Sequence, residues 1–224
     1  MDNNLGSVHI AGAGTVAGGN YNEVRCSGSA KITGDVRCTL VACSGAVKSL
    51  GNIECEGSVK IAGSFSSEGE IKADVFKAAG AVNVEKSLSA RVIEVAGAFK
   101  VLGDMSAENA EIHGSVSVEG LINADELLVV LDHNSSSDSK VNTIGGSRVS
   151  VKKGKKVWRL FRRCYSCLKA GLIEADRVEL ENTYASTVRT IDAFIGEGCK
   201  IGTLEYSGEA KISEKAEIEN IVRI

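Results

Sequence analysis

The sequence predicts an all-β fold, a single-stranded β-helix (β-solenoid) with about 17 residues per coil and a central insertion. Three observations lead to this prediction: a glycine that recurs at regular intervals, alternation of apolar and polar residues between the glycines, and few aromatic residues. Only 4% of the 224 residues are aromatic although 43% are hydrophobic, so the core must consist mainly of Val, Ile, Leu and Ala. Such small and β-branched side chains suit a narrow interior lined by strands.

The recurring glycine sets the length of a coil. A segment Gly-Ser-Val-x-Ile-x-Gly begins at Gly6, and its relatives begin at Gly28, Gly45, Gly63, Gly80, Gly97 and Gly114. The last five intervals are nearly equal, and we interpret the longer first interval, from Gly6 to Gly28, as one coil with a small insertion. Equivalent residues of successive coils should therefore stack about 4.8 Å apart, as neighbouring strands do.

The residues between the glycines alternate with the period of 2 that is typical of strands. Mostly apolar or small residues recur two, four, eight and ten positions after each glycine, among them Val84 and Val101. The residues between them are mostly polar, as Lys31 is. We expect the first set to point into the solenoid and the second set to point outward, whereas an amphipathic helix would need spacings of three and four.

The repeat is interrupted after Leu131 and resumes at Gly171. We therefore expect solenoid coils over 1–131, an insertion over 132–170, and C-terminal solenoid coils over 171–224. Within the insertion, the polar run Asp132–Asp138 is typical of a loop, and Val141–Lys153 is expected to form a hairpin around Gly145 and Gly146.

Charge and cysteine content favour a cytoplasmic protein. The net charge is −3, from 26 basic and 29 acidic residues, which gives no reason to expect nucleic-acid binding. The sequence shows neither a secretory signal nor an apolar run long enough to span a membrane. Seven cysteines, an odd number, fit a reducing compartment better than a disulfide framework. A peripheral position at the inner face of the membrane is the alternative.

We predict no catalytic residues, no cofactor and no metal site. His9 and His113 lie several coils apart and His133 lies in the polar loop, so they cannot share a zinc ion. Cys26 and Cys43 are one coil length apart, as are Cys38 and Cys55, so each pair should stack in the core. Cys164 and Cys167 form one CxxC motif without a second ligand pair, and Cys199 stands alone.

A basic and aromatic segment follows the expected hairpin. Trp158, Phe161, Tyr165 and Leu168 are spaced by three, four and three residues, which is helical periodicity. Such a helix could bind an anionic membrane surface or could pack on the solenoid, and the sequence leaves both open. The membrane-binding hypothesis involves Lys152, Lys153, Lys155, Lys156, Trp158, Arg159, Phe161, Arg162 and Arg163.

One stretch near the C-terminus resembles a known family. The residues from Ile173 to Tyr206, IEADRVELENTYASTVRTIDAFIGEGCKIGTLEY, are similar to the end of bacterial bactofilin-like, polymer-forming cytoskeletal proteins. The resemblance implies a right-handed β-helix that joins end to end into filaments without nucleotide. It also implies a cytoplasmic scaffold that helps to set cell shape and positions other proteins. Members of that family have Pro-rich tails, whereas this chain has no proline.

The expected function is that of a self-assembling scaffold, not an enzyme, whose main partner is another copy of itself. An open-ended solenoid exposes strand edges that can pair with another copy. The candidate self-association residues are Leu5, Val8, Ile10, Ile218, Ile221, Val222 and Ile224.

Two alternatives remain open. One is an adaptor that binds other proteins on its solenoid faces without polymerising. The other is a hexapeptide-type acyltransferase, since Gly196–Gly202 is weakly similar to the coils of those enzymes. Such an enzyme would need a general-base histidine at a subunit cleft.

Overall fold

The computed structural model describes residues 5–132, 138–154 and 166–224, and the regular structure within these ranges consists of β-strands. They divide into two compact units, Met1–Ala107 and Glu108–Ile224, which we describe separately. In each unit the strands pair in parallel with residues about one coil length away, which confirms the predicted β-solenoid and its repeat. The described residues include no helix of the length and hydropathy needed to cross a membrane.

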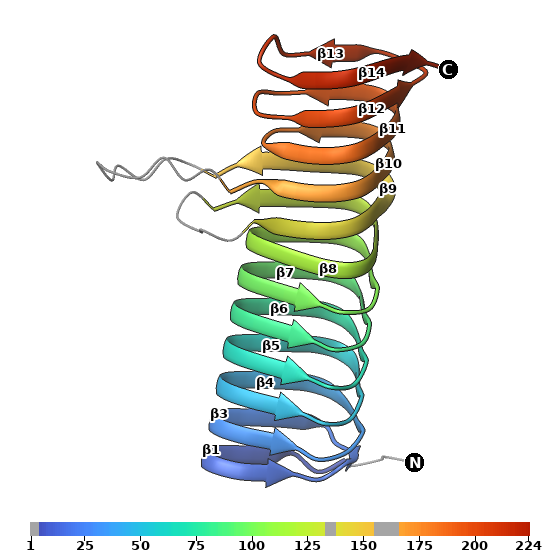
Figure 1. Ribbon diagram of the computed structural model, residues 1–224. Helices are drawn as coiled ribbons and strands as arrows, with labels where there is room; N and C mark the ends of the chain where they lie inside the picture. The colour runs from blue at the N-terminus through green and yellow to red at the C-terminus, as the bar shows by residue number, and fades with distance from the viewer. Residues whose placement is uncertain (1–4, 133–137, 155–165) are drawn as a thin grey trace, which may run out of the picture. The chain divides into compact units, whose positions relative to one another are not determined.

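The first unit is a stack of parallel strands, drawn in blue to green in Figure 1. Its hydrogen-bonded neighbours follow the order β1-β3-β4-β5-β6-β7, and the short β2 pairs with β4. The strands are β1 (Val8–Val16), β2 (Gly19–Asn20), β3 (Glu23–Ile32), β4 (Val36–Ser49), β5 (Ile53–Ser67), β6 (Ile71–Val84) and β7 (Leu88–Val101).

The glycines stack as predicted, except in the first coil. Gly12, and not Gly6, lies opposite Gly28, so the first step runs from Gly12 to Gly28 and contains no insertion. The φ angle of Gly12 is 93° and that of Gly28 is 112°, a conformation that glycine adopts without steric cost. The prediction was wrong because alternation with period 2 fits more than one alignment of the first segment, and only the strand hydrogen bonds select one.

The inward and outward positions of the first unit agree with the predicted alternation. Val84 and Val101 are fully buried, and Lys31 is exposed. Cys26 lies opposite Cys43, and Cys38 lies opposite Cys55, and all four side chains are buried. The core is therefore built from columns of small and β-branched side chains, as the composition indicates.

The second unit contains the remaining parallel strands, yellow-green to red in Figure 1. Their order is β8-β9-β10-β11-β12-β14, and β13 pairs with β11. The strands are β8 (Met105–Leu131), which begins just before the unit, β9 (Ser139–Lys153), β10 (Leu168–Leu180), β11 (Thr183–Ile195), β12 (Lys200–Tyr206), β13 (Ala210–Ile212) and β14 (Glu217–Arg223).

The hairpin expected at Val141–Lys153 is wrong. These residues belong to one strand, β9, which pairs in parallel with β8 on one side and β10 on the other. A Cβ atom at Gly146 would collide with the carbonyl oxygen of Ala124 in the neighbouring coil. The two glycines suggested a turn, but Gly146 is needed for this close approach between coils. Strand β9 thus forms part of a coil inside 132–170, the range expected as an insertion. Of the loop predicted at Asp132–Asp138, residues 133–137 lie outside the described residues.

Candidate self-association site at the coil ends

The first coil is covered on one side only. Within the described residues, β1 pairs with β3 and with no strand on its other edge. Val8 and Ile10 are half-buried, whereas Val24 and Cys26, which lie opposite them in β3, are 0% and 1% exposed. The free edge of β1 carries backbone N–H and C=O groups that can pair with another strand.

The last coil shows the same contrast. Ile218 lies opposite Ile201 and Ile221 lies opposite Leu204, and both inner partners are buried. Ile218 itself is half-buried and Ile221 is 53% exposed. Complete burial of one isoleucine side chain contributes about 1.5–3 kcal/mol. A partner that covers this coil would therefore gain a substantial apolar contribution.

The remaining candidate residues take different positions. Leu5 is exposed ahead of β1, and Ile224 is exposed after β14. Val222 is exposed and lies opposite Glu205, whose carboxylate pairs with Arg189 on the outer surface. Val222 therefore belongs to an outward column, since strand neighbours in register share a face.

One residue of this end was missed by sequence analysis. Ile212 of β13 lies opposite the buried Ile195, yet it is itself 39% exposed because no described strand covers β13. Its place in the alternating stretch Gly208–Ile212 marked it as part of a coil.

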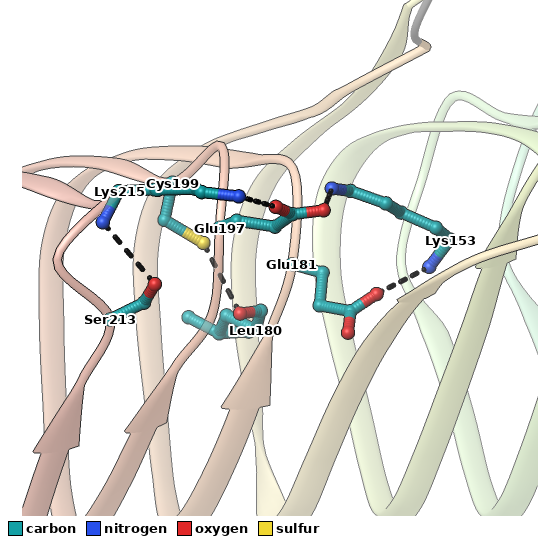
Figure 2. A network of polar contacts seen from close by, with 7 residues as sticks. All are labelled: Lys153, Leu180, Glu181, Glu197, Cys199, Ser213 and Lys215. Carbon is teal, nitrogen blue, oxygen red and sulfur yellow. Dashed lines mark hydrogen bonds and ion pairs between the residues drawn. The ribbon is translucent and has the colours of Figure 1, made fainter.

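A polar network joins the end of β9 to residues that follow β10, β11 and β13, in four successive coils of the second unit (Figure 2). The Lys153 ammonium group lies 2.5 Å from one carboxylate oxygen of Glu197, and that of Lys215 lies 3.2 Å from the other. The backbone N–H of Lys153 donates to the Glu181 carboxylate at 2.9 Å. The hydrogen bond from Lys153, followed by that from Lys215, lowers the pKa of Glu197. The network links β9 to the turns after β11 and β13, so its evident role is to hold neighbouring coils together.

The membrane-binding set is described only in part. Lys153 pairs with Glu197, and Lys152 lies 3.8 Å from the Glu179 carboxylate. Both described ammonium groups therefore have acidic partners on the solenoid. The other members lie outside the described residues: Lys155, Lys156, Trp158, Arg159, Phe161, Arg162 and Arg163.

In each stacked cysteine pair a hydrogen bond between the two thiols shifts their pKa values in opposite directions. A hydrogen bond from Cys38 lowers the pKa of Cys55 to about 7, and one from Cys43 lowers the pKa of Cys26. The same contacts and burial raise the pKa of Cys38 and of Cys43. Each pair thus behaves as two thiols in contact, packed in the core as predicted.

The other cysteines and the histidines weighed in the sequence analysis lie apart from one another where the structure describes them. Burial raises the pKa of Cys167 to about 11 and also raises the pKa of Cys199. His9 is exposed on β1, His113 contacts Glu111 at 2.5 Å, and His133 and Cys164 lie outside the described residues. Among the described side chains, no three of the His, Cys, Asp and Glu type come together as metal ligands.

A shallow hollow lies on the second unit near its last coils. Lys169, Tyr184, Lys200 and Glu217 line it and lie opposite one another in successive strands. Lys169 pairs with Asp138 at 2.7 Å, and Lys200 pairs with Glu217 at 2.8 Å. The hollow is therefore a surface of mutually paired charges beside one exposed tyrosine.

Comparisons with known proteins give two partial relatives. The chain is 36% identical over 104 residues to the uncharacterized protein YhbF of Bacillus subtilis (strain 168), which covers 46% of this chain and 42% of that protein. It is 36% identical over 105 residues to the uncharacterized protein YhbE of the same strain, covering 46% of this chain and 43% of that protein. The matches thus span less than half of either relative. No family model matches the chain, and no experimentally determined structure matches it.

Proposed function

We propose that the protein is a structural scaffold that polymerises through its coil ends without nucleotide and positions other proteins in a bacterial cell. One observation carries the proposal: inward-pointing apolar residues at both end coils are partly exposed, while their partners one coil further in are buried. A second copy would cover them with matching strands and apolar columns. The resemblance of Ile173–Tyr206 to bactofilin-like proteins supports the same function.

Such a protein acts through surfaces that contact other copies and other proteins, and not through a reaction centre. The polar network around Glu197 is satisfied by its own lysines, and the buried cysteines contact each other. These groups are therefore explained by holding coils together. An acetyl-CoA turnover assay tests the acyltransferase alternative, and turnover would contradict the non-enzymatic proposal.

The test is the concentration dependence of particle mass. The full chain without end tags, at about 10–100 µM, where weak contacts form, should give assemblies in sedimentation and elongated particles in negative-stain microscopy. Addition of ATP or GTP should leave the mass unchanged. Ile221→Lys should lower the mass, and Lys31→Gln, on the outer surface of the first unit, is the control. A wild type that stays monomeric over this range would rule out the proposal.

An adaptor function is the second candidate, supported by the hollow around Tyr184. The adaptor function would be favoured over the polymer if the wild type is monomeric and binds a defined partner, and if the Tyr184→Ala variant no longer binds that partner.

A further inference from the structure

Two pairs of buried thiols are stacked between neighbouring coils of the first unit. Cys26 of β3 lies directly opposite Cys43 of β4, and we call these residues the first pair. Cys38 of β4 lies directly opposite Cys55 of β5, and these residues form the second pair. All four thiols are free and buried, and within each pair they are in hydrogen-bonding contact.

The spacing of the strands suits one metal ion between the two sulfur atoms of a pair. Residues in register on adjacent parallel strands lie about 4.8 Å apart, and stacked side chains of the same type repeat this separation. Two metal–thiolate bonds in line span about 4.6 Å when each has the length of a zinc–thiolate bond. Rotation about the Cα–Cβ bonds can therefore place the two sulfur atoms on opposite sides of one ion without a shift of the backbone.

The surroundings of the pairs select the kind of ion. Ile10 and Ile61 flank the first pair in its column, and Ala73 follows Cys55 in the column of the second pair. Within the described ranges, no third side chain of the His, Cys, Asp or Glu type completes either pair as a metal site. A structural zinc ion takes four ligands. Cu(I) is a soft ion that thiolates select, and it is stable with two sulfur ligands in line.

Binding of Cu(I) to such a pair is a ligand exchange without a redox step. Each thiol releases its proton to water, and each sulfur atom forms one bond to the ion. Two protons leave and one positive charge enters, so the complex carries a single negative charge that two polarisable sulfur atoms share. Burial of a charge is unfavourable, and the two metal–sulfur bonds offset this cost. No electron is transferred, and no co-reactant is needed.

We infer that each stacked cysteine pair of the first unit is a two-coordinate site for Cu(I), which joins neighbouring coils through a sulfur–copper–sulfur bridge. The first pair would link β3 to β4, and the second pair would link β4 to β5. The sequence predicted core packing for these cysteines and no metal site, and the contact between the thiols in register is what the structure adds. This inference goes beyond the proposed scaffold and does not depend on self-assembly.

The number of copper ions that the protein retains is the test. The full chain with Cys164→Ser is the starting protein, because Cys164 and Cys167 form a CxxC motif that could hold an ion by itself. It is loaded with Cu(I) in the absence of oxygen and is then dialysed against a Cu(I) chelator, which removes ions held by single thiols. The starting protein should retain two ions per chain.

Replacement of one thiol in each pair should remove one ion. Cys26→Val and Cys38→Ala introduce residues that already fill the same columns in other coils, as Val95 and Ala73 do. Both variants should therefore fold, which circular dichroism verifies. Each should retain one ion per chain, and the double variant should retain none.

Cys199→Val is the matched control. Cys199 and Cys26 are both 1% exposed, but the Cys199 thiol donates to the carbonyl oxygen of Leu180. This variant should still retain two ions per chain. An equal loss of copper in Cys199→Val and Cys26→Val would overturn the inference, and so would two ions retained by either paired variant.

Two measurements on the starting protein alone complete the test. X-ray absorption should show two sulfur neighbours for each copper ion, and loading should raise the unfolding temperature because the ion binds the folded pair. A folded starting protein that retains no copper would overturn the inference. Nitrogen or oxygen neighbours of the copper, or more than two sulfur neighbours, would also overturn it.

Discussion

Gly97 of β7 lies directly opposite Gly80 of β6, and both have positive φ angles, 131° and 130°. A Cβ atom at Gly97 would fall far inside van der Waals contact with the Gly80 carbonyl oxygen. The glycine column is thus required both by its backbone conformation and by the close approach of neighbouring coils.

Gly97→Ala should destabilise the first unit. The unfavourable backbone conformation alone costs about 1–3 kcal/mol, and the collision with Gly80 adds to it. Ala96→Ser and Ala98→Ser are suitable controls, because both alanines are exposed neighbours. Denaturant unfolding measures the effect, and equal stability of Gly97→Ala and the controls would contradict this account of the column.

Val84→Asp and Val101→Asp should lower the free energy of unfolding by about 3 kcal/mol or more, because each buries a charge without a partner. Both valines are 0% exposed. Lys31→Asp, at an exposed outward position, should change stability by about 0.5 kcal/mol or less. The same unfolding measurement applies, and similar losses at all three positions would show that the columns are wrongly assigned.

The Glu197 network should remain charged in moderately acidic solution. Hydrogen bonds from Lys153 and Lys215 lower the pKa of Glu197 from its ordinary 4.5. Its contribution to stability is therefore present above the unfolded-state pKa and is lost as the pH falls through the lowered folded-state value. NMR titration of the carboxyl carbon measures this pKa, and Lys153→Met should raise it. An ordinary pKa in the wild type would mean that the ion pairs do not form in solution.

Binding to anionic vesicles tests the basic segment. The wild type should co-sediment with phosphatidylserine vesicles at low salt and should dissociate as salt is added, because charge attraction is screened. The informative variant replaces Lys155, Lys156, Arg159, Arg162 and Arg163 with Gln and keeps Lys152 and Lys153, which pair with carboxylates of the solenoid. Equal binding by this variant would refute the membrane hypothesis.

The sequence by itself determined the coil length and the inward face. Both properties are local and periodic: alternation with period 2 marks the buried side of each strand, and the coil length of about 17 residues brings Cys26 beside Cys43 and Val84 beside Val101. No knowledge of distant contacts was needed for these assignments, because the coils from β3 to β7 repeat them.

Only the tertiary structure decided the register of individual coils and the nature of the ends. Gly12 replaced Gly6 as the partner of Gly28, and Gly146 proved to serve a close approach to Ala124 and not a turn. Glycine fits both uses, so its identity does not distinguish them. The exposure of Ile212 and Ile221 depends on which strands have a neighbour on both sides, and that is a property of the assembled stack of coils.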